Sequence, residues 1–146
     1  MSYKDVLIVG AGAAGSAAAF HLAKAGISVG LLEKETHSPI KPCGGGIAAA
    51  VQEWFPFDLK PSVEDVIKRV EFSWCLTDPV IADLPGSAPF WIVRREKLDK
   101  LLASHAINAG AELFKPFEVS QIKKTTKGWT ASNQDGQTLH ARAIVL

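Results

Sequence analysis

Apolar and polar positions at the start of the chain alternate between short apolar runs and one helical pattern. Residues 5–9 are almost continuously apolar, which is typical of a buried strand in a parallel sheet. Residues 16–25 are rich in alanine and stop at Gly26, so they predict a helix. Residues 28–32 predict a second strand that ends at Glu33. The order strand, helix, strand predicts an α/β fold with a parallel sheet.

The middle of the chain has a different pattern. Residues 47–55 predict a short helix. Residues 66–76 and 80–84 predict the two strands of an antiparallel ribbon, and Thr77-Asp78-Pro79 between them is a turn signal. Residues 90–93 predict one more short strand. This region is therefore expected to lie outside the parallel sheet.

The last third of the chain returns to a helix followed by strands. Three- and four-residue spacing puts six residues on one face of an amphipathic helix: Leu98, Leu101, Leu102, His105, Ala106 and Ala109. Residues 111–114 predict a buried strand added to the parallel sheet. Three further segments predict an antiparallel β-meander: 117–125, 129–133 and 137–142. Another buried strand is expected to begin at Ala143.

Composition narrows the class of protein. The 146 residues are 47% hydrophobic and 21% charged, which predicts one soluble globular domain. A net charge of +1 gives no reason to expect a nucleic-acid partner, and no apolar run reaches the roughly 18 residues of a membrane span. Cys43 and Cys75 form neither a disulfide framework nor a zinc pattern, and Cys75 beside Trp74 is expected in the core. We therefore expect a cytoplasmic protein without a bound metal.

Candidate chemistry is concentrated in the turn after the first strand, Gly10-Ala11-Gly12-Ala13-Ala14-Gly15. In a strand–turn–helix context this G-x-G-x-x-G spacing predicts a dinucleotide site. Gly10 makes the tight turn, Gly12 lets the backbone approach a pyrophosphate, and Gly15 lets the helix pack closely on the strand. The N–H groups that open the helix would face the phosphates. Glu33, about 20 residues later, is placed to bind ribose hydroxyls.

A second glycine-rich stretch follows in Lys41-Pro42-Cys43-Gly44-Gly45-Gly46. Three consecutive glycines are costly to order, because glycine loses the most backbone freedom on folding. Two interpretations stay open on the glycines alone. One is a ligand that passes close to the backbone, and the other is a flexible surface connector.

Four segments together carry a family resemblance: DVLIVGAGAAGSAAAFHLAKAGISVGLLEK, KPCGGGI, WIVRREKLDKLLASHAINAGAEL and ARAIVL. In this order they resemble the N-terminal, FAD-binding part of flavin-dependent geranylgeranyl reductases, which belong to the same broad group as the aromatic-ring hydroxylases. The first segment is shared by many FAD and NAD proteins, whereas the Pro-Cys-Gly-Gly-Gly stretch is specific to the reductase branch. The resemblance implies a Rossmann-like FAD-binding fold of the glutathione-reductase (GR2) type.

The resemblance also implies roles for single residues. The turn would hold the FAD pyrophosphate, with a backbone contact from Ala14, and Glu33 would bind the adenosine ribose. Cys43 would lie along the flavin and is a candidate thiol donor. Arg95 would face the FAD phosphate or ribitol, with Arg94 as the alternative, and Val119 would hold the adenine through its backbone. The full set of implied cofactor residues is Gly10, Gly12, Ala13, Ala14, Gly15, Glu33, Lys34, Cys43, Gly44, Gly45, Gly46, Arg95 and Val119.

Three functions follow from the resemblance and its limits. The first is reduction of carbon–carbon double bonds in prenyl groups, with an apolar prenyl-lipid substrate, an electron donor of the NADPH or ferredoxin type, and peripheral membrane association. The second is a ring-hydroxylase-type flavin monooxygenase. The third is a non-catalytic dinucleotide-binding fragment, because the family continues past the strand at Ile144 into a Gly-Asp segment and a substrate domain. We therefore expect residues 1–146 to be a truncated FAD-binding domain.

Overall fold

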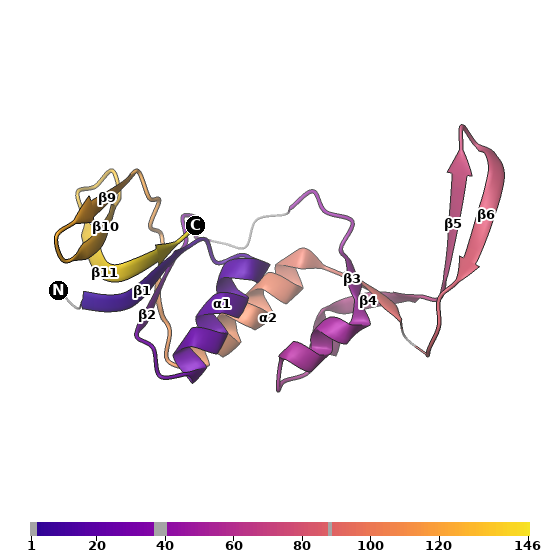
Figure 1. The fold of residues 1–146 in the computed structure, drawn as a ribbon, viewed down its shortest axis with the longest axis horizontal. Helices are drawn as coiled ribbons and strands as arrows, with labels where there is room; N and C mark the ends of the chain where they lie inside the picture. The colour runs from indigo at the N-terminus through magenta and orange to yellow at the C-terminus, as the bar shows by residue number, and fades with distance from the viewer. Residues whose placement is uncertain (1–2, 37–40, 88) are drawn as a thin grey trace. The chain divides into compact units, whose positions relative to one another are not determined.

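A computed structural model describes residues 3–36, 41–87 and 89–146 of the chain. The chain forms two compact units, and each is described here by itself (Figure 1). Unit 1 comprises residues 1–39 and 99–146, and unit 2 comprises residues 40–98. No helix in the described part of the chain is both long and apolar enough to span a bilayer.

Unit 1 is built on a six-stranded sheet in the order β8-β2-β1-β11-β10-β9. The strand bounds are β1 Tyr3–Val9, β2 Val29–Leu32, β8 Glu112–Phe114, β9 Gln121–Thr125, β10 Gly128–Ser132 and β11 Thr138–Val145. Strands β8, β2, β1 and β11 run parallel, while β11, β10 and β9 form the antiparallel meander. This confirms the predicted parallel sheet and the predicted meander.

Strand β11 belongs to both parts of this sheet, which corrects one expectation. The predicted meander strand 137–142 and the strand predicted to begin at Ala143 are one continuous element. Its beginning pairs antiparallel with β10, and it also pairs parallel with β1 from Tyr3 to Ile8. Ala143 and Val145 are exposed rather than buried.

Two helices accompany the sheet, α1 Ala13–Lys24 and α2 Arg95–Asn108. Helix α1 packs against β1 and β2, and its buried residues are Ser16, Ala19, Phe20 and Ala23. Helix α2 begins in unit 2 and continues into unit 1 from Asp99. Its Leu98, Leu102 and Ala106 are buried, which confirms the predicted apolar face.

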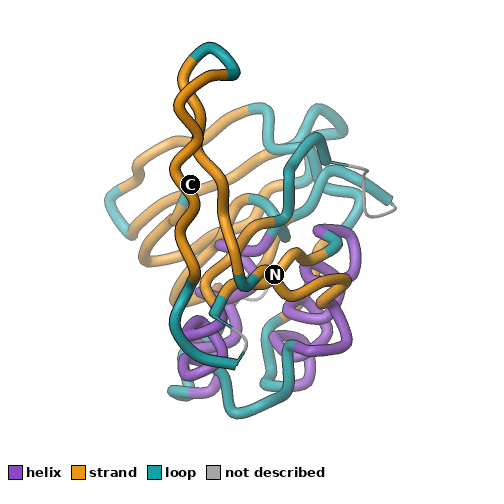
Figure 2. The backbone as a smooth tube through the Cα atoms, turned by 90° about the vertical axis from the view of Figure 1, so that its right-hand side faces the viewer, coloured by secondary structure: helices purple, strands orange, loops and turns teal. Residues whose placement is uncertain are grey.

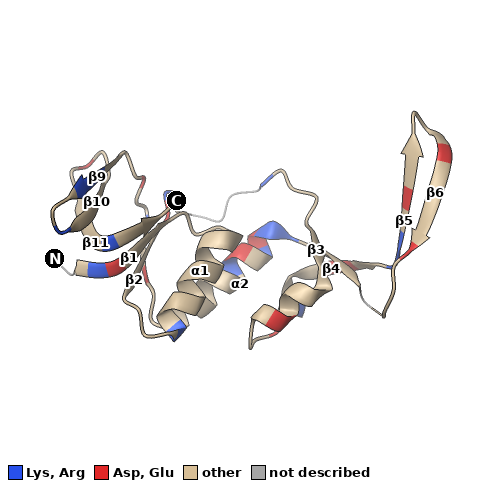
Figure 3. Cartoon of the chain, in the orientation of Figure 1, with Lys and Arg blue, Asp and Glu red and all other residues tan. Residues whose placement is uncertain are grey.

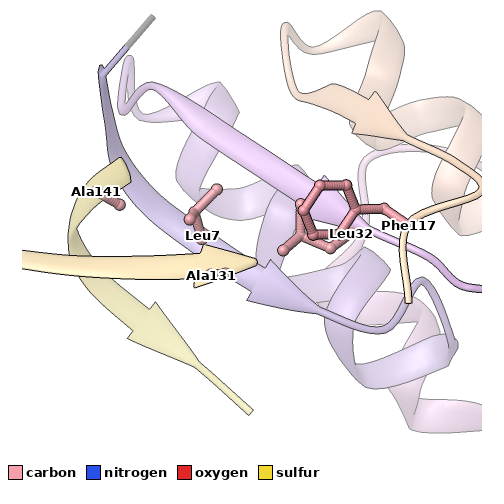
Figure 4. Packing of buried hydrophobic residues seen from close by; sticks show 5 residues of the cluster. All are labelled: Leu7, Leu32, Phe117, Ala131 and Ala141. Atoms are coloured by element: carbon pink, nitrogen blue, oxygen red, sulfur yellow. The ribbon is translucent and has the colours of Figure 1, made fainter. Parts of the chain in front are cut away.

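The core of unit 1 forms around buried residues from the parallel strands and the meander (Figure 4). The members of the buried cluster are Leu7, Leu32, Phe117, Ala131 and Ala141. Val9, Phe114, Val119, Leu139 and Ile144 pack against it and are partly buried. The cluster joins the ends of β1 and β2 to the segment that follows β8, so the strand ends that would carry a ligand have a packed support.

Unit 2 holds a three-stranded antiparallel sheet in the order β3-β7-β4 and a separate ribbon. The bounds are β3 Gly46–Ala48, β4 Val63–Ile67, β7 Phe90–Val93, and β5 Arg69–Trp74 with β6 Thr77–Asp83 for the ribbon. Two 3-10 helices, η1 Ala49–Trp54 and η2 Lys60–Ser62, lie between β3 and β4. In Figure 2 the ribbon is the long pair of orange strands joined by a teal turn.

Two element predictions in unit 2 were wrong in detail. The helix predicted for 47–55 begins at Ala49, because Ile47 and Ala48 pair with β7. The strand predicted for 66–76 is two strands in different sheets, since β4 pairs with β7 and β5 pairs with β6. The alternation is imperfect at the break itself, where the apolar pair Val66-Ile67 is followed by the polar pair Lys68-Arg69.

The tip of the ribbon corrects a burial prediction. Arg69 lies opposite Asp83 and Trp74 opposite Thr77, so the turn falls on Cys75 and Leu76 rather than on Thr77-Asp78-Pro79. Trp74 is 79% exposed, Leu76 is 95% exposed, and Cys75 is also exposed. Cys75 is therefore not a core residue.

Candidate functional site

The glycine turn joins β1 to α1 with the geometry that its sequence predicts. Gly10 has a φ of +100°, a left-handed conformation that favours glycine, and its N–H donates to the carbonyl oxygen of Leu32 at 2.7 Å. A Cβ on Gly15 would lie 2.0 Å from the carbonyl oxygen of Gly10 and 3.3 Å from Cγ2 of Ile8. The absence of a side chain at Gly15 is therefore what lets the helix pack on the strand.

The first turn of α1 offers backbone donors without a competing side chain. Gly12 is the N-cap residue and provides no side-chain cap, and the first turn contains no acidic residue. Figure 3 shows the first turn of α1 without an acidic or basic residue, and the basic Lys24 lies in the last turn. The first-turn N–H groups and the positive end of the helix dipole therefore suit an anion such as a pyrophosphate.

Glu33 follows β2 and reaches back to the glycine turn. Its Oε2 accepts a hydrogen bond from the N–H of Ala11 at 2.8 Å, and its Oε1 accepts one from the N–H of Glu35 at 3.0 Å. The residue is half-buried. Sequence reasoning assigned Glu33 to a ribose and missed this role in holding the turn. The neighbouring Lys34 Nζ lies 3.8 Å from Glu35 Oε1, and the Lys34 side chain is exposed whereas Glu35 is half-buried.

Apart from Val119, the other predicted residues lie in unit 2, near the end of the β3-β7-β4 sheet where β3 begins. The strands are antiparallel, so the start of β3, the end of β7 and the start of β4 meet at the same edge. A hollow of about 490 Å³ lies there. Its lining includes Lys41, Cys43, Gly44, Glu64, Ile92, Val93, Arg94, Arg95 and Glu96. The structure thus brings together Cys43, Gly44 and Arg95 at one hollow, and their contact with a cofactor stays a prediction.

The three consecutive glycines have different roles. Gly45 has a φ of +73°, and a Cβ there would lie 2.1 Å from the carbonyl oxygen of Val93. A Cβ on Gly46 would lie 2.8 Å from the ring of Phe90. Gly44 lines the hollow, and a Cβ there would meet nothing within 4 Å. Gly45 and Gly46 therefore permit close packing against β7, and a ligand that passes close to this loop stays a prediction.

The arginine pair at the start of α2 is surrounded by acidic residues. Arg94 Nε lies 3.5 Å from Glu64 Oε1, and Arg94 Nη1 lies 3.7 Å from Glu96 Oε1. Lys97 Nζ donates to the same Glu64 oxygen at 2.6 Å. This hydrogen bond from Lys97, aided by the positive charge of Arg94, lowers the pKa of Glu64 below its usual range. Arg95, half-buried, lines the hollow beside them.

Val119 is the remaining predicted cofactor residue, and it lies in unit 1. Val119 is half-buried against the core of unit 1, just before β9, and its contact with an adenine stays a prediction.

Among the residues that the structure describes, no three His, Cys, Asp or Glu side chains gather in an arrangement that could hold a metal.

These features fit a dinucleotide cofactor by their own chemistry. Unit 1 combines a glycine turn that excludes side chains, a helix N-terminus without a side-chain cap and a carboxylate at the end of the neighbouring strand. The backbone N–H groups suited to phosphates therefore lie beside a carboxylate suited to ribose hydroxyls, because Glu33 accepts a hydrogen bond from Ala11 in the glycine turn. The assignment of single residues to single cofactor atoms stays a prediction.

Comparison with known proteins supplies the family. Residues 5–73 match the FAD binding domain family. Digeranylgeranylglycerophospholipid reductase 2 of Methanothermobacter thermautotrophicus is 35% identical over 114 residues, covering 75% of this chain and 29% of that protein. An uncharacterised Methanosarcina barkeri protein from the nifH2 5′ region is 35% identical over 131 residues, covering 84% of this chain and 70% of that protein.

A solved structure agrees with these relatives. The geranylgeranyl bacteriochlorophyll reductase-like protein of Thermoplasma acidophilum superposes with a TM-score of 0.85 at 25% identity, over 99% of this chain and 38% of that one. The chain spans less than a third of the length of the curated reductases it matches. The fold is therefore the Rossmann-like FAD-binding fold that the resemblance implied. The chain is similar over three quarters of its length to the FAD-binding part of flavin-dependent geranylgeranyl reductases.

Proposed function

We propose that this chain binds FAD for the reduction of carbon–carbon double bonds in prenyl groups. The observation that carries the proposal is the glycine turn of unit 1 with its helix N-terminus and Glu33. Gly15 can only be glycine there, because a Cβ would meet the Gly10 carbonyl oxygen at 2.0 Å. FAD, when bound, supplies the hydride chemistry of the reaction, and the protein supplies binding and orientation.

The residues of this chain have separate tasks in the proposal. The first-turn N–H groups of α1 bind the pyrophosphate, and Glu33 accepts hydrogen bonds from the ribose hydroxyls. Arg95 contributes positive charge at the hollow of unit 2. Cys43, which lines the same hollow and accepts a hydrogen bond from the N–H of Gly45 at 3.4 Å, is proposed to lie beside the flavin.

The substrate class rests on the relatives. The Methanothermobacter relative is called a digeranylgeranylglycerophospholipid reductase, so we propose a geranylgeranyl lipid as the substrate. Reduction of each double bond adds one hydride and one proton to the two carbons. The described residues identify neither the acid that gives the proton nor the electron donor, and an NADPH- or ferredoxin-type donor stays a proposal.

The proposal predicts oxidation of the reduced cofactor by an unsaturated prenyl lipid. The chain is loaded with FAD, photoreduced without oxygen and mixed with a geranylgeranyl glycerolipid in detergent. We expect the oxidised flavin absorption to return and mass spectrometry to show a lipid that has gained hydrogen. The fully saturated lipid with the same headgroup is the matched control.

Two results would contradict this function. Equal reoxidation by the saturated and unsaturated lipids would show that the prenyl double bonds are not the electron acceptor. NADPH oxidation that depends on an aromatic acid and oxygen would favour the ring-hydroxylase alternative instead.

A further inference from the structure

Glu64 occupies a β-bulge at the edge of the hollow in unit 2. Val63 lies opposite Val93 and Asp65 lies opposite Ile92, so Glu64 is the extra residue of β4 between two successive positions of β7. A bulge changes the direction in which a side chain leaves the strand, and bulges are frequent beside functional sites. Here the irregularity coincides with an acidic residue that lines the hollow.

The Glu64 carboxylate contacts two cations at the start of α2. Oε1 accepts from Lys97 Nζ at 2.6 Å, and Oε2 lies 3.5 Å from Arg94 Nη2. The backbone reinforces this link, because the N–H of Arg94 donates to the carbonyl oxygen of Ser62 at 3.0 Å. Ser62 is itself buried, and its hydroxyl donates to the Leu59 carbonyl oxygen at 2.7 Å. The first turn of α2 is thus held from the β4 side by one side chain and one backbone bond.

We propose that Glu64 is a positioning residue that fixes Arg94 and Lys97, and with them the first turn of α2, so that Arg95 faces the cofactor. This inference rests on the proposed function, because it assumes that FAD reaches the hollow. Glu64 itself does not need to touch the cofactor.

A role of Glu64 through its charge alone and a positioning role predict opposite changes in FAD affinity when the charge is removed. A carboxylate beside an anion site repels the anion, so removing its charge would strengthen FAD binding. A positioning role predicts weaker binding, because Arg94 and Lys97 lose their common partner and the first turn of α2 can shift. The sign of the change in affinity therefore separates the two roles.

The test compares Glu64→Gln with Glu64→Asp and with the control Asp65→Asn. Asp65 is the next residue of β4, is exposed, and does not line the hollow, so its variant makes the same charge change without the bulge contact. FAD affinity is measured by quenching of flavin fluorescence. We expect Glu64→Gln to weaken binding by up to about fivefold, the range of an exposed ion pair. Glu64→Asp should recover part of the loss, and Asp65→Asn should match the wild type.

Two further readouts separate positioning from general destabilisation. AMP carries only the adenosine half of FAD, so its affinity should be the same in Glu64→Gln and the wild type. The effect of Glu64→Gln should also disappear when Arg94 and Lys97 are both glutamine, because the proposed action runs through them.

The proposal is overturned if Glu64→Gln binds FAD as tightly as the wild type or more tightly. It is also overturned if AMP binding falls in parallel, since that indicates a loss of folded protein. Failure of the proposed function is recognised separately and earlier, because the wild-type chain would then bind no FAD.

Discussion

Replacing Gly45 by alanine should destabilise unit 2 by about 2–3 kcal/mol. Gly45 lies at a φ of +73°, and the new Cβ would lie 2.1 Å from the carbonyl oxygen of Val93. That oxygen belongs to the backbone of the central strand β7, so the clash cannot be relieved by rotating a side chain. The Gly45 carbonyl also accepts the N–H of Val93 at 2.8 Å, and a shift would weaken this bond.

The measurement for Gly45→Ala is urea unfolding followed by circular dichroism and tryptophan fluorescence. The buried Trp91 in β7 makes the fluorescence signal sensitive to this strand. Gly44→Ala is the matched control, because a Cβ there meets nothing within 4 Å, and its cost should stay below about 0.5 kcal/mol. Equal midpoints for the two variants would show that the close contact with Val93 is not a constraint.

Replacing Glu33 by alanine should weaken FAD binding by about 10- to 100-fold. The expected range corresponds to the roughly 1.5–3 kcal/mol of a hydrogen bond to a charged group. Two effects add here: the ribose loses its acceptor, and the N–H of Ala11 loses the Oε2 partner that it has at 2.8 Å. Fluorescence titration with FAD measures the loss.

Two control variants show which effect dominates. Glu33→Gln keeps a carbonyl oxygen for the turn but removes the charge, so its affinity should lie between those of Glu33→Ala and the wild type. Cys43→Ala should cost less than Glu33→Ala, because Cys43 is an exposed residue of the loop before β3. Equal losses for Glu33→Ala and Cys43→Ala would contradict the ribose assignment.

The sequence predicted unit 1 well because its signals are local. Strand β1 ends in a continuous apolar run at residues 6–9, α1 has its glycine turn directly before it, and the meander strands are separated by short turns. Each of these features depends on residues within a few positions of one another. The dual pairing of β11 was missed, because pairing with β1 joins residues more than a hundred positions apart.

Unit 2 was predicted less well because its pairing is non-local. Residues 66–76 alternate only imperfectly, and the partners of each half show that β4 and β5 belong to different sheets. The predicted burial of Cys75 failed for the same reason, since the register of the ribbon decides which residues form its tip.

The candidate site shows the same division. The glycine turn, Glu33 and the loop at Cys43 were found from motifs, whereas Glu64 and the backbone contacts of Glu33 were not. A bulge leaves no mark in the sequence, because it is defined by the pairing of Val63 and Asp65 with β7. An isolated glutamate in a strand is usually a solvated surface residue, and only its contacts with Lys97 and Arg94 suggest more.

Retention of FAD by the purified wild-type chain tests the central claim most directly. The chain is mixed with excess FAD, passed through a desalting column and examined by visible absorption, with circular dichroism as the check that it is folded. The account predicts that flavin absorption elutes with the protein and that excess AMP reduces the amount retained. A folded chain that elutes without flavin would contradict the assignment of the glycine turn and Glu33 to FAD.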